Sequence, residues 1–148
     1  MLEILTVESN SIADELGVKP GDSLLSINGN PVNDLVDYLV EESNELLYLQ
    51  IARSDGGLLD VAIGHDSEEP VGRGLPHPDP KQCGNNCLFC FVHQLPRGMR
   101  RSLYVKDEDY RFSYLYGAYV TLTNLSEDDL QRILTKHLSP LYVSVHAA

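Results

Sequence analysis

Three cysteines within eight residues constrain this chain more than any other feature. Cys83, Cys87 and Cys90 are the only cysteines among its 148 residues. Such clustering indicates thiols that act together on one ion or cluster, rather than thiols that pack a core one at a time. Thiolates are soft ligands that suit zinc and iron–sulfur clusters. Three of them leave a fourth coordination position to another group, and chemistry can occur at that position.

Composition and length restrict the class of protein. A chain of 148 residues has room for one ordinary domain or two small ones, and its 43% hydrophobic content is enough for a core. No run of about 18 apolar residues occurs, so we expect no membrane span. The first residues lack the basic segment and apolar run of a secretory signal. An odd number of clustered cysteines fits a reducing cytosol, so we expect a cytoplasmic protein.

Charge is distributed unevenly along the chain. The first 70 residues carry 15 acidic and 2 basic side chains, whereas the rest carry 7 and 9. The shift coincides with a stretch over residues 70–80 that holds four prolines and two glycines, which suits neither a helix nor a central strand. We therefore predict a first domain over 1–66, a linker over 67–80 and a second domain over 81–148. The acidic first half would repel phosphates, so no nucleic-acid partner is expected.

Turn signals and apolar patterns predict a small mixed unit in the first half. Asn28–Gly29 is the strongest short hairpin signal in the chain, because both residues tolerate positive φ. Pro20–Gly21 predicts a turn, and Ser11 is a good helix cap. The expected strands are residues 2–7, 23–27, 47–53 and 58–63, and the expected helices are residues 12–16 and 34–47.

The segments 11–22 and 25–32, with these turns in this order, resemble a bacterial PDZ domain over about residues 1–64. The resemblance implies that an extended peptide or protein partner adds a strand to a sheet edge. The sequence begins directly on its first strand, without residues for the family's glycine-containing carboxylate-binding loop. A docking or stabilising module is therefore the alternative that we favour over peptide capture.

The spacing Cys-x3-Cys-x2-Cys differs from the paired spacing of common structural zinc sites. It resembles the cluster loop of the radical S-adenosylmethionine (radical SAM) superfamily. The resemblance implies that Cys83, Cys87 and Cys90 bind three irons of a [4Fe–4S] cluster and that S-adenosylmethionine chelates the fourth. Reductive cleavage then yields a 5′-deoxyadenosyl radical that abstracts hydrogen from a substrate, here unknown. Phe89 is implied to pack against the adenine.

A zinc site is the alternative for the same loop. His93 follows Cys90 by three residues, so the four side chains can form a closed Cys3His site in a non-enzymatic interaction protein. Three crowded thiols without a metal are less expected, since they would be prone to oxidation.

Further segments of the second half resemble one particular group within the radical SAM superfamily. The segments 87–117, 121–125 and 141–146 look like the DUF512 group, uncharacterised bacterial proteins with a PDZ-like domain ahead of a radical SAM domain. The expected fold class is therefore α+β and α/β: a small PDZ-like β-sandwich-type domain, then the first βα units of a partial (β/α)6 barrel. The group implies no particular reaction.

Strand ends supply the remaining candidates, because barrel enzymes place site residues at the C-terminal ends of their strands. We expect strands at about 119–123 and 140–145, a helix over 126–137 capped by Ser126, and a strand before the cysteine loop. The chain then holds only about three barrel strands, which is expected of a fragment. The candidate cofactor-binding residues at these strand ends are Thr121, Thr123, Asn124 and Ser144, with His146 a weaker one.

The only basic cluster has two interpretations. It comprises Arg97, Arg100, Arg101, Lys106 and Arg111. These side chains can hold an anionic substrate or the carboxylate of S-adenosylmethionine. The preferred interpretation is a solvated face that balances the acids at 107–109.

Overall fold

The computed structural model describes residues 1–64 and 73–145 of the chain. The chain divides into two compact units, Met1–Pro78 and Asp79–Ala148. His146 and the first part of the expected linker lie outside the described residues. No helix in the described ranges is both long enough and apolar enough to cross a membrane.

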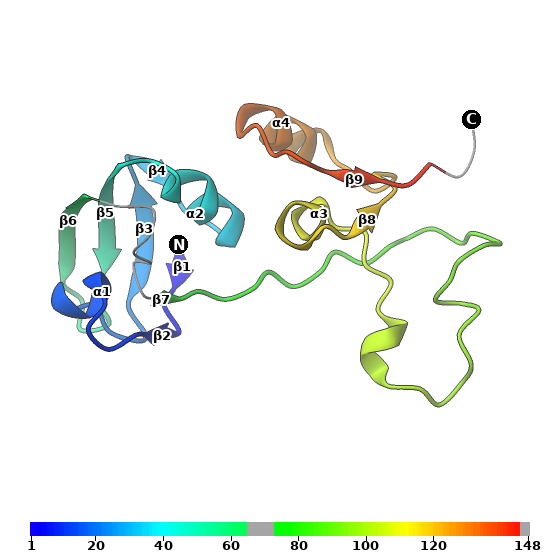
Figure 1. Ribbon diagram of the computed structural model, residues 1–148, viewed down its shortest axis with the longest axis horizontal. Coiled ribbons are helices and arrows are strands. Elements are labelled where there is room, and N and C mark those ends of the chain that lie inside the picture. The colour runs from blue at the N-terminus through cyan, green and yellow to red at the C-terminus, as the bar shows by residue number, and fades with distance from the viewer. Residues whose placement is uncertain (65–72, 146–148) are drawn as a thin grey trace. The chain divides into compact units, whose positions relative to one another are not determined.

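The first unit is built on an antiparallel sheet with strand order β1-β3-β5-β6, in which β4 also pairs with β3. In Figure 1, β3, β5 and β6 stand side by side. A separate two-stranded ladder joins β2 and β7. The elements of this unit are β1 (Leu2–Glu3), β2 (Thr6–Val7), α1 (Ile12–Glu15), β3 (Ser23–Ile27), β4 (Asn30–Pro31), α2 (Leu35–Glu42), β5 (Leu46–Ala52), β6 (Leu58–Gly64) and β7 (Arg73–Gly74).

Both predicted hairpins are present. Asn28 and Gly29 have φ angles of 52° and 79°, so the two-residue turn between β3 and β4 has the positive φ values that suit a twisted hairpin. The second hairpin joins β5 to β6 in continuous register from Leu46 opposite Gly64 to Ala52 opposite Leu58. Turn chemistry was therefore a reliable guide in this unit.

Side-chain caps fix where the helices begin. The Ser11 hydroxyl accepts the amide N–H of Asp14 at the start of α1. The Asp34 carboxylate accepts two amide N–H groups at the start of α2. The latter helix ends at Glu42, short of the predicted residue 47, because Leu46 and the residues after it extend to pair with β6.

The core of the first unit follows from strand alternation. Leu47, Leu49 and Ile51 of β5 are buried, whereas Leu46 and Tyr48 are exposed. These three side chains meet residues from the other strands and from both helices. The buried cluster comprises Leu2, Ile4, Ala13, Val18, Leu24, Ile27, Val32, Tyr38, Leu47, Leu49, Ile51 and Ile63.

The second unit contains one βαβ crossover. The strands β8 and β9 pair in parallel, with Tyr119 opposite Tyr142, and α4 lies between them in the sequence. This confirms a mixed α/β arrangement, while a partial barrel is not shown. The elements are a 3-10 helix (Arg101–Tyr104), α3 (Tyr110–Tyr116), β8 (Tyr119–Val120), α4 (Glu127–Thr135) and β9 (Tyr142–Val143).

The strand expected directly before the cysteine loop does not form in the described residues. In its place, Gln82 makes an isolated antiparallel bridge with Asp107. The prolines at 76, 78 and 80 have no amide hydrogen to donate, so this segment cannot pair as a central strand. The expectation of a barrel strand at this place was wrong.

The two helices of the second unit differ in how well they were anticipated. The helix α4 begins as predicted, with a capping box in which Ser126 and Asp129 satisfy each other's amide groups. The helix α3 was not predicted, because its sequence is rich in aromatic residues that favour strands. Asp109 caps its start, and Gly117, at φ 71°, ends it.

The interior of the second unit depends on polar contacts. The buried apolar side chains described there are Tyr110, Val120 and Leu138, and Glu108, Asp109 and Ser113 are buried beside them. So few apolar side chains contribute little hydrophobic stabilisation. The hydrogen bonds of the buried polar residues are therefore expected to matter more in this unit than in the first.

Candidate metal and cofactor site

Backbone pairing positions the cysteine loop. The amide N–H of Cys83 donates to the carbonyl of Lys106 at 2.6 Å, and the amide of Glu108 donates to the carbonyl of Lys81 at 2.9 Å. With the bridge at Gln82, these bonds tie the start of the loop to the segment just before α3. Two turns follow along the loop: the Cys90 amide donates to the Cys87 carbonyl at 3.2 Å, and the Gln94 amide donates to the Cys90 carbonyl at 3.2 Å. The loop thus begins beside residues 106–108.

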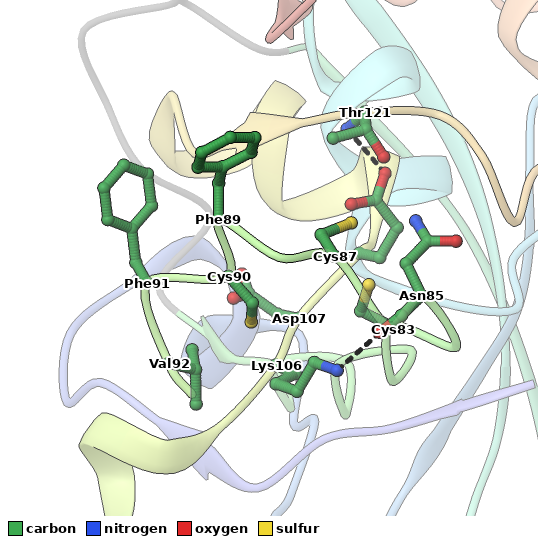
Figure 2. Close-up of a pocket in the computed structure, with 11 residues that line it drawn as sticks. Cys83, Asn85, Cys87, Phe89, Cys90, Phe91, Val92, Lys106, Asp107 and Thr121 are labelled. Atoms are coloured by element: carbon green, nitrogen blue, oxygen red, sulfur yellow. Dashed lines mark hydrogen bonds between the residues drawn. The ribbon is translucent and has the colours of Figure 1, made fainter. Parts of the chain in front are cut away.

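The three cysteines line a single pocket. The cavity has a volume of about 210 Å³. Figure 2 shows the cysteine side chains around this pocket, with Thr121 on one side and Lys106 on the other. The residues that line it are Cys83, Asn85, Cys87, Phe89, Cys90, Phe91, Val92, Lys106, Asp107, Glu108 and Thr121. Thiols, aromatic rings, one basic side chain and two acidic side chains therefore meet in one place.

The donor set fits a cluster or metal, although the thiols are not drawn together around one point. Cys83 and Cys90 are half-buried and Cys87 is exposed. Within residues 1–64 and 73–145, no group of three or more Cys, His, Asp or Glu side chains is placed to hold a metal ion. Three soft donors on one short loop suit an iron–sulfur cluster or zinc. Phe89 and Phe91, about three-quarters exposed, flank Cys90 and line the pocket, where they can shield such a group.

Glu108 fixes the end of β8 where that strand reaches the pocket. Its side chain is buried, and its Oε1 accepts the amide N–H groups of Thr121 and Leu122, both at 2.6 Å. Leu122 adopts φ 60°, which is unusual for a residue other than glycine. The carboxylate therefore holds a left-handed turn that ends the predicted strand after two residues and aims Thr121 at the cavity.

Side chains beyond this turn connect it to the cysteine loop. The Thr121 and Thr123 hydroxyls lie 3.0 Å apart, and the Asn85 amide donates to the Thr123 hydroxyl. The Lys106 ammonium donates to the Asn85 carbonyl at 2.7 Å. This network joins the loop, the end of β8 and the segment before α3.

A buried ion pair anchors the segment on which the loop begins. Asp109, fully buried, accepts the amide N–H of Lys81 at 3.0 Å and pairs with the Arg111 guanidinium at 2.7 Å. Arg111 in turn donates to the Asp79 carbonyl. Burial by itself would raise the pKa of the Asp109 carboxyl, but the hydrogen bonds from Arg111 and Lys81 and the guanidinium charge outweigh it and lower that pKa.

A second pair continues this anchor into α4. The Lys81 ammonium contacts both oxygens of Asp129 at 2.7 Å and lies 5.5 Å from the centre of the Tyr110 ring. Burial would raise the pKa of Asp129, but the hydrogen bonds from Lys81 and Ser126 and the charge of Lys81 lower it overall. Lys81, two residues before Cys83, is therefore bound by Asp109 at the start of α3 and by Asp129 in α4.

The other sequence candidates lie outside the pocket lining. The Asn124 side chain donates to the Gln82 carbonyl at 3.5 Å, and Ser144 bonds through its amide to the Val120 carbonyl at 2.8 Å. His93 lies 3.4 Å from the Lys106 ammonium. Of the basic cluster, Lys106 lines the pocket and Arg111 pairs with Asp109. Arg97, Arg100 and Arg101 are exposed, as a solvated face requires, whereas Glu108 and Asp109, two of the acids that this face was expected to balance, are buried.

The sequence did not predict the roles of three residues of the site. Asn85 bonds to Thr123, Lys106 bonds to the Asn85 carbonyl, and Glu108 accepts the amide of Thr121. No local signal marks them, because each acts on a segment at least 13 residues away. The acidic run 107–109 next to a basic cluster reads as solvated surface in the sequence. Burial by the fold is what separates Glu108 and Asp109 from it.

The fold and the site define a protein in which a small β-rich unit precedes an α/β unit with a three-cysteine loop. Residues 3–53 match the family described as PDZ domain, and residues 65–148 match the one described as Radical SAM-like domain. The second match covers more than half of the chain. The chain therefore belongs to the Radical SAM-like family and carries a PDZ domain ahead of that region.

Two curated relatives share a shorter likeness. The chain is 34% identical over 85 residues to synaptopodin-2 of Rattus norvegicus and 32% identical over 85 residues to synaptopodin-2 of Mus musculus. Each alignment covers 55% of this chain but only 7% or 8% of the relative. The chain thus spans less than a tenth of these proteins.

Proposed function

We propose that the chain binds a [4Fe–4S] cluster through Cys83, Cys87 and Cys90 and cleaves S-adenosylmethionine reductively, with hydrogen abstraction from a substrate yet to be identified. One observation carries the proposal: the three thiols line a single pocket within a region that matches a Radical SAM-like domain. The order of the two domains supports membership of the DUF512 group. When bound, the cluster supplies the electron that breaks a sulfonium bond of S-adenosylmethionine.

The chain's own residues have distinct roles in this proposal. Phe89 offers a ring to the adenine, and Thr121 and Thr123 offer hydroxyls at the end of β8. Asn124 and Ser144 are the outer candidates for contacts with the same cofactor. Lys106 holds the loop through the Asn85 carbonyl and brings a positive charge to the pocket wall, where it favours an anionic ligand group.

The zinc alternative is the second candidate function, that of an interaction protein with a structural Cys3His site. The contact between the Lys106 ammonium and Nε2 of His93 argues against it. A zinc ion on this nitrogen would have to displace the ammonium and tolerate its like charge nearby.

Electron paramagnetic resonance of the reduced, anaerobically reconstituted chain tests the proposal. We expect a [4Fe–4S]⁺ signal that changes when S-adenosylmethionine is added, because three thiolates leave one iron open. A cluster signal indifferent to S-adenosylmethionine would contradict the cofactor part of the proposal. Stoichiometric zinc without iron would contradict all of it and favour the second candidate.

A variant at Glu108 tests whether the turn after β8 is part of the cofactor site. In Glu108→Ala the half-buried amide groups of Thr121 and Leu122 lose their acceptor, and the cost for each is at most that of a fully buried unsatisfied amide, about 1–3 kcal/mol. We expect the affinity for S-adenosylmethionine, measured by titrating the spectral change, to fall about tenfold or more while the iron content stays unchanged.

The matched control is Glu108→Gln, which keeps an oxygen acceptor at the same place. We expect this variant to bind S-adenosylmethionine within about threefold of the wild type. Amide exchange at Val120 shows whether the strand persists in both variants. Unchanged affinity in Glu108→Ala would remove the turn from the site.

A further inference from the structure

A short segment of the chain pairs with the PDZ unit from outside the matched PDZ region. The match ends at residue 53, yet β7, at Arg73–Gly74, forms an antiparallel ladder with β2 in which Thr6 faces Gly74. The amide N–H of Leu5 donates to the Gly74 carbonyl at 2.9 Å. Figure 1 shows β7 beside β2. The segment therefore binds as an added strand does.

The contact selects for glycine at its centre. A Cβ atom on Gly74 would lie 2.1 Å from the Thr6 hydroxyl, which would have to move, and 3.3 Å from the Thr6 Cβ, which is tighter than an ordinary contact. The next residue, Leu75, packs against the buried core of the unit, as Val7 does from β2. The surface thus fits an extended strand in which glycine faces Thr6 and an apolar residue follows.

We infer that the β2 edge is a strand-addition site for a segment containing Gly-Leu, and that residues 73–75 occupy it as an internal ligand. An extended peptide gains affinity at such a site from main-chain hydrogen bonds and specificity from alternate side chains. Only eight residues separate Gly64 from Arg73, so the internal segment is present at the β2 edge at an effective concentration of about millimolar. It therefore competes with any outside peptide for that edge. An outside peptide of the same kind binds only when this segment has left. This inference does not depend on the proposed radical chemistry.

The test uses the full chain and a labelled synthetic peptide with the sequence of residues 71–77. Gly74→Val places a branched side chain against Thr6 and is expected to release the segment. Amide exchange at Leu5 should then accelerate, and the peptide should bind at least tenfold more tightly than it binds the wild type, as measured by fluorescence anisotropy. Added peptide should restore the protection of Leu5. A peptide with valine in place of the glycine should not bind.

Two results overturn the inference. In the first, Leu5 stays protected in Gly74→Val, so the glycine does not hold the segment. In the second, Leu5 loses protection but the peptide binds no more tightly than to the wild type, so the edge is not a site. Amide exchange at Ile27, in the core, shows whether the unit has kept its fold.

A second pair of variants keeps the test decisive should the valine unfold the unit. Gly74→Ala introduces the clash with the Thr6 hydroxyl, and Thr6→Ala in the same chain removes that hydroxyl. We expect the single variant to bind the peptide more tightly than the double variant, whose internal segment returns to the edge. Equal binding by the two chains would overturn the inference.

Discussion

Replacing Cys87 with alanine is expected to abolish iron binding by the reconstituted chain. Cys87 is the exposed member of three thiols that line one pocket, and two thiolates do not hold a cluster that leaves one iron open. Iron and sulfide per chain should fall to background in the variant. The amide signals of Leu24 and Ile27, both buried in the first unit, should stay unchanged, because that unit has its own core.

His93→Ala is the matched control, since it removes the nearest other metal-binding side chain from the same loop. We expect it to keep its iron, because His93 does not line the pocket with the thiols. Loss of a bound metal in His93→Ala as well as in Cys87→Ala would indicate a Cys3His site instead. Loss of the first unit's fold in Cys87→Ala would contradict the independence of the two units.

Features encoded by neighbouring residues were predicted well. The hairpin at Asn28–Gly29 needs positive φ at two adjacent positions, and Asn-Gly is the residue pair that adopts such angles most readily. The start of α4 at Ser126 depends on a cap and an acid three residues later. The cysteine spacing belongs to the same class, because one short loop carries all three thiols.

Features that depend on distant residues were not predicted. The β8 strand ends early because Glu108 captures two amide groups 13 and 14 residues later. The aromatic helix α3 forms where local propensity favours a strand, and burial of Tyr110 and Ser113 decides the outcome. The pairing of β7 with β2 joins residues 68 positions apart in the sequence, at Thr6 and Gly74. Such contacts leave no local pattern.

The buried ion pair of Asp109 with Arg111 makes the second unit sensitive to one substitution. We expect Asp109→Asn to destabilise this unit by about 3–5 kcal/mol, because breaking a buried ion pair leaves a charge without its partner. Here that charge is the Arg111 guanidinium, whose side chain is only 16% exposed. The amide of Lys81 would also face a weaker acceptor. Urea unfolding followed through the amide signal of Val120 measures the loss.

Lowering the pH should reproduce, in the wild type, part of the stability loss expected for Asp109→Asn. Because the folded state lowers the pKa of Asp109 below its usual 3.8, the ionised carboxylate contributes its full stability above about pH 5 and loses it as the pH falls through the lowered value. The Asp109→Asn chain should therefore lose less stability than the wild type on acidification.

The matched control for Asp109→Asn is Asp128→Asn, the same change at an exposed position of α4, which should cost less than about 1 kcal/mol of stability. Equal losses of stability at neutral pH in Asp109→Asn and Asp128→Asn would mean that the buried pair stabilises the second unit no more than an exposed carboxylate does.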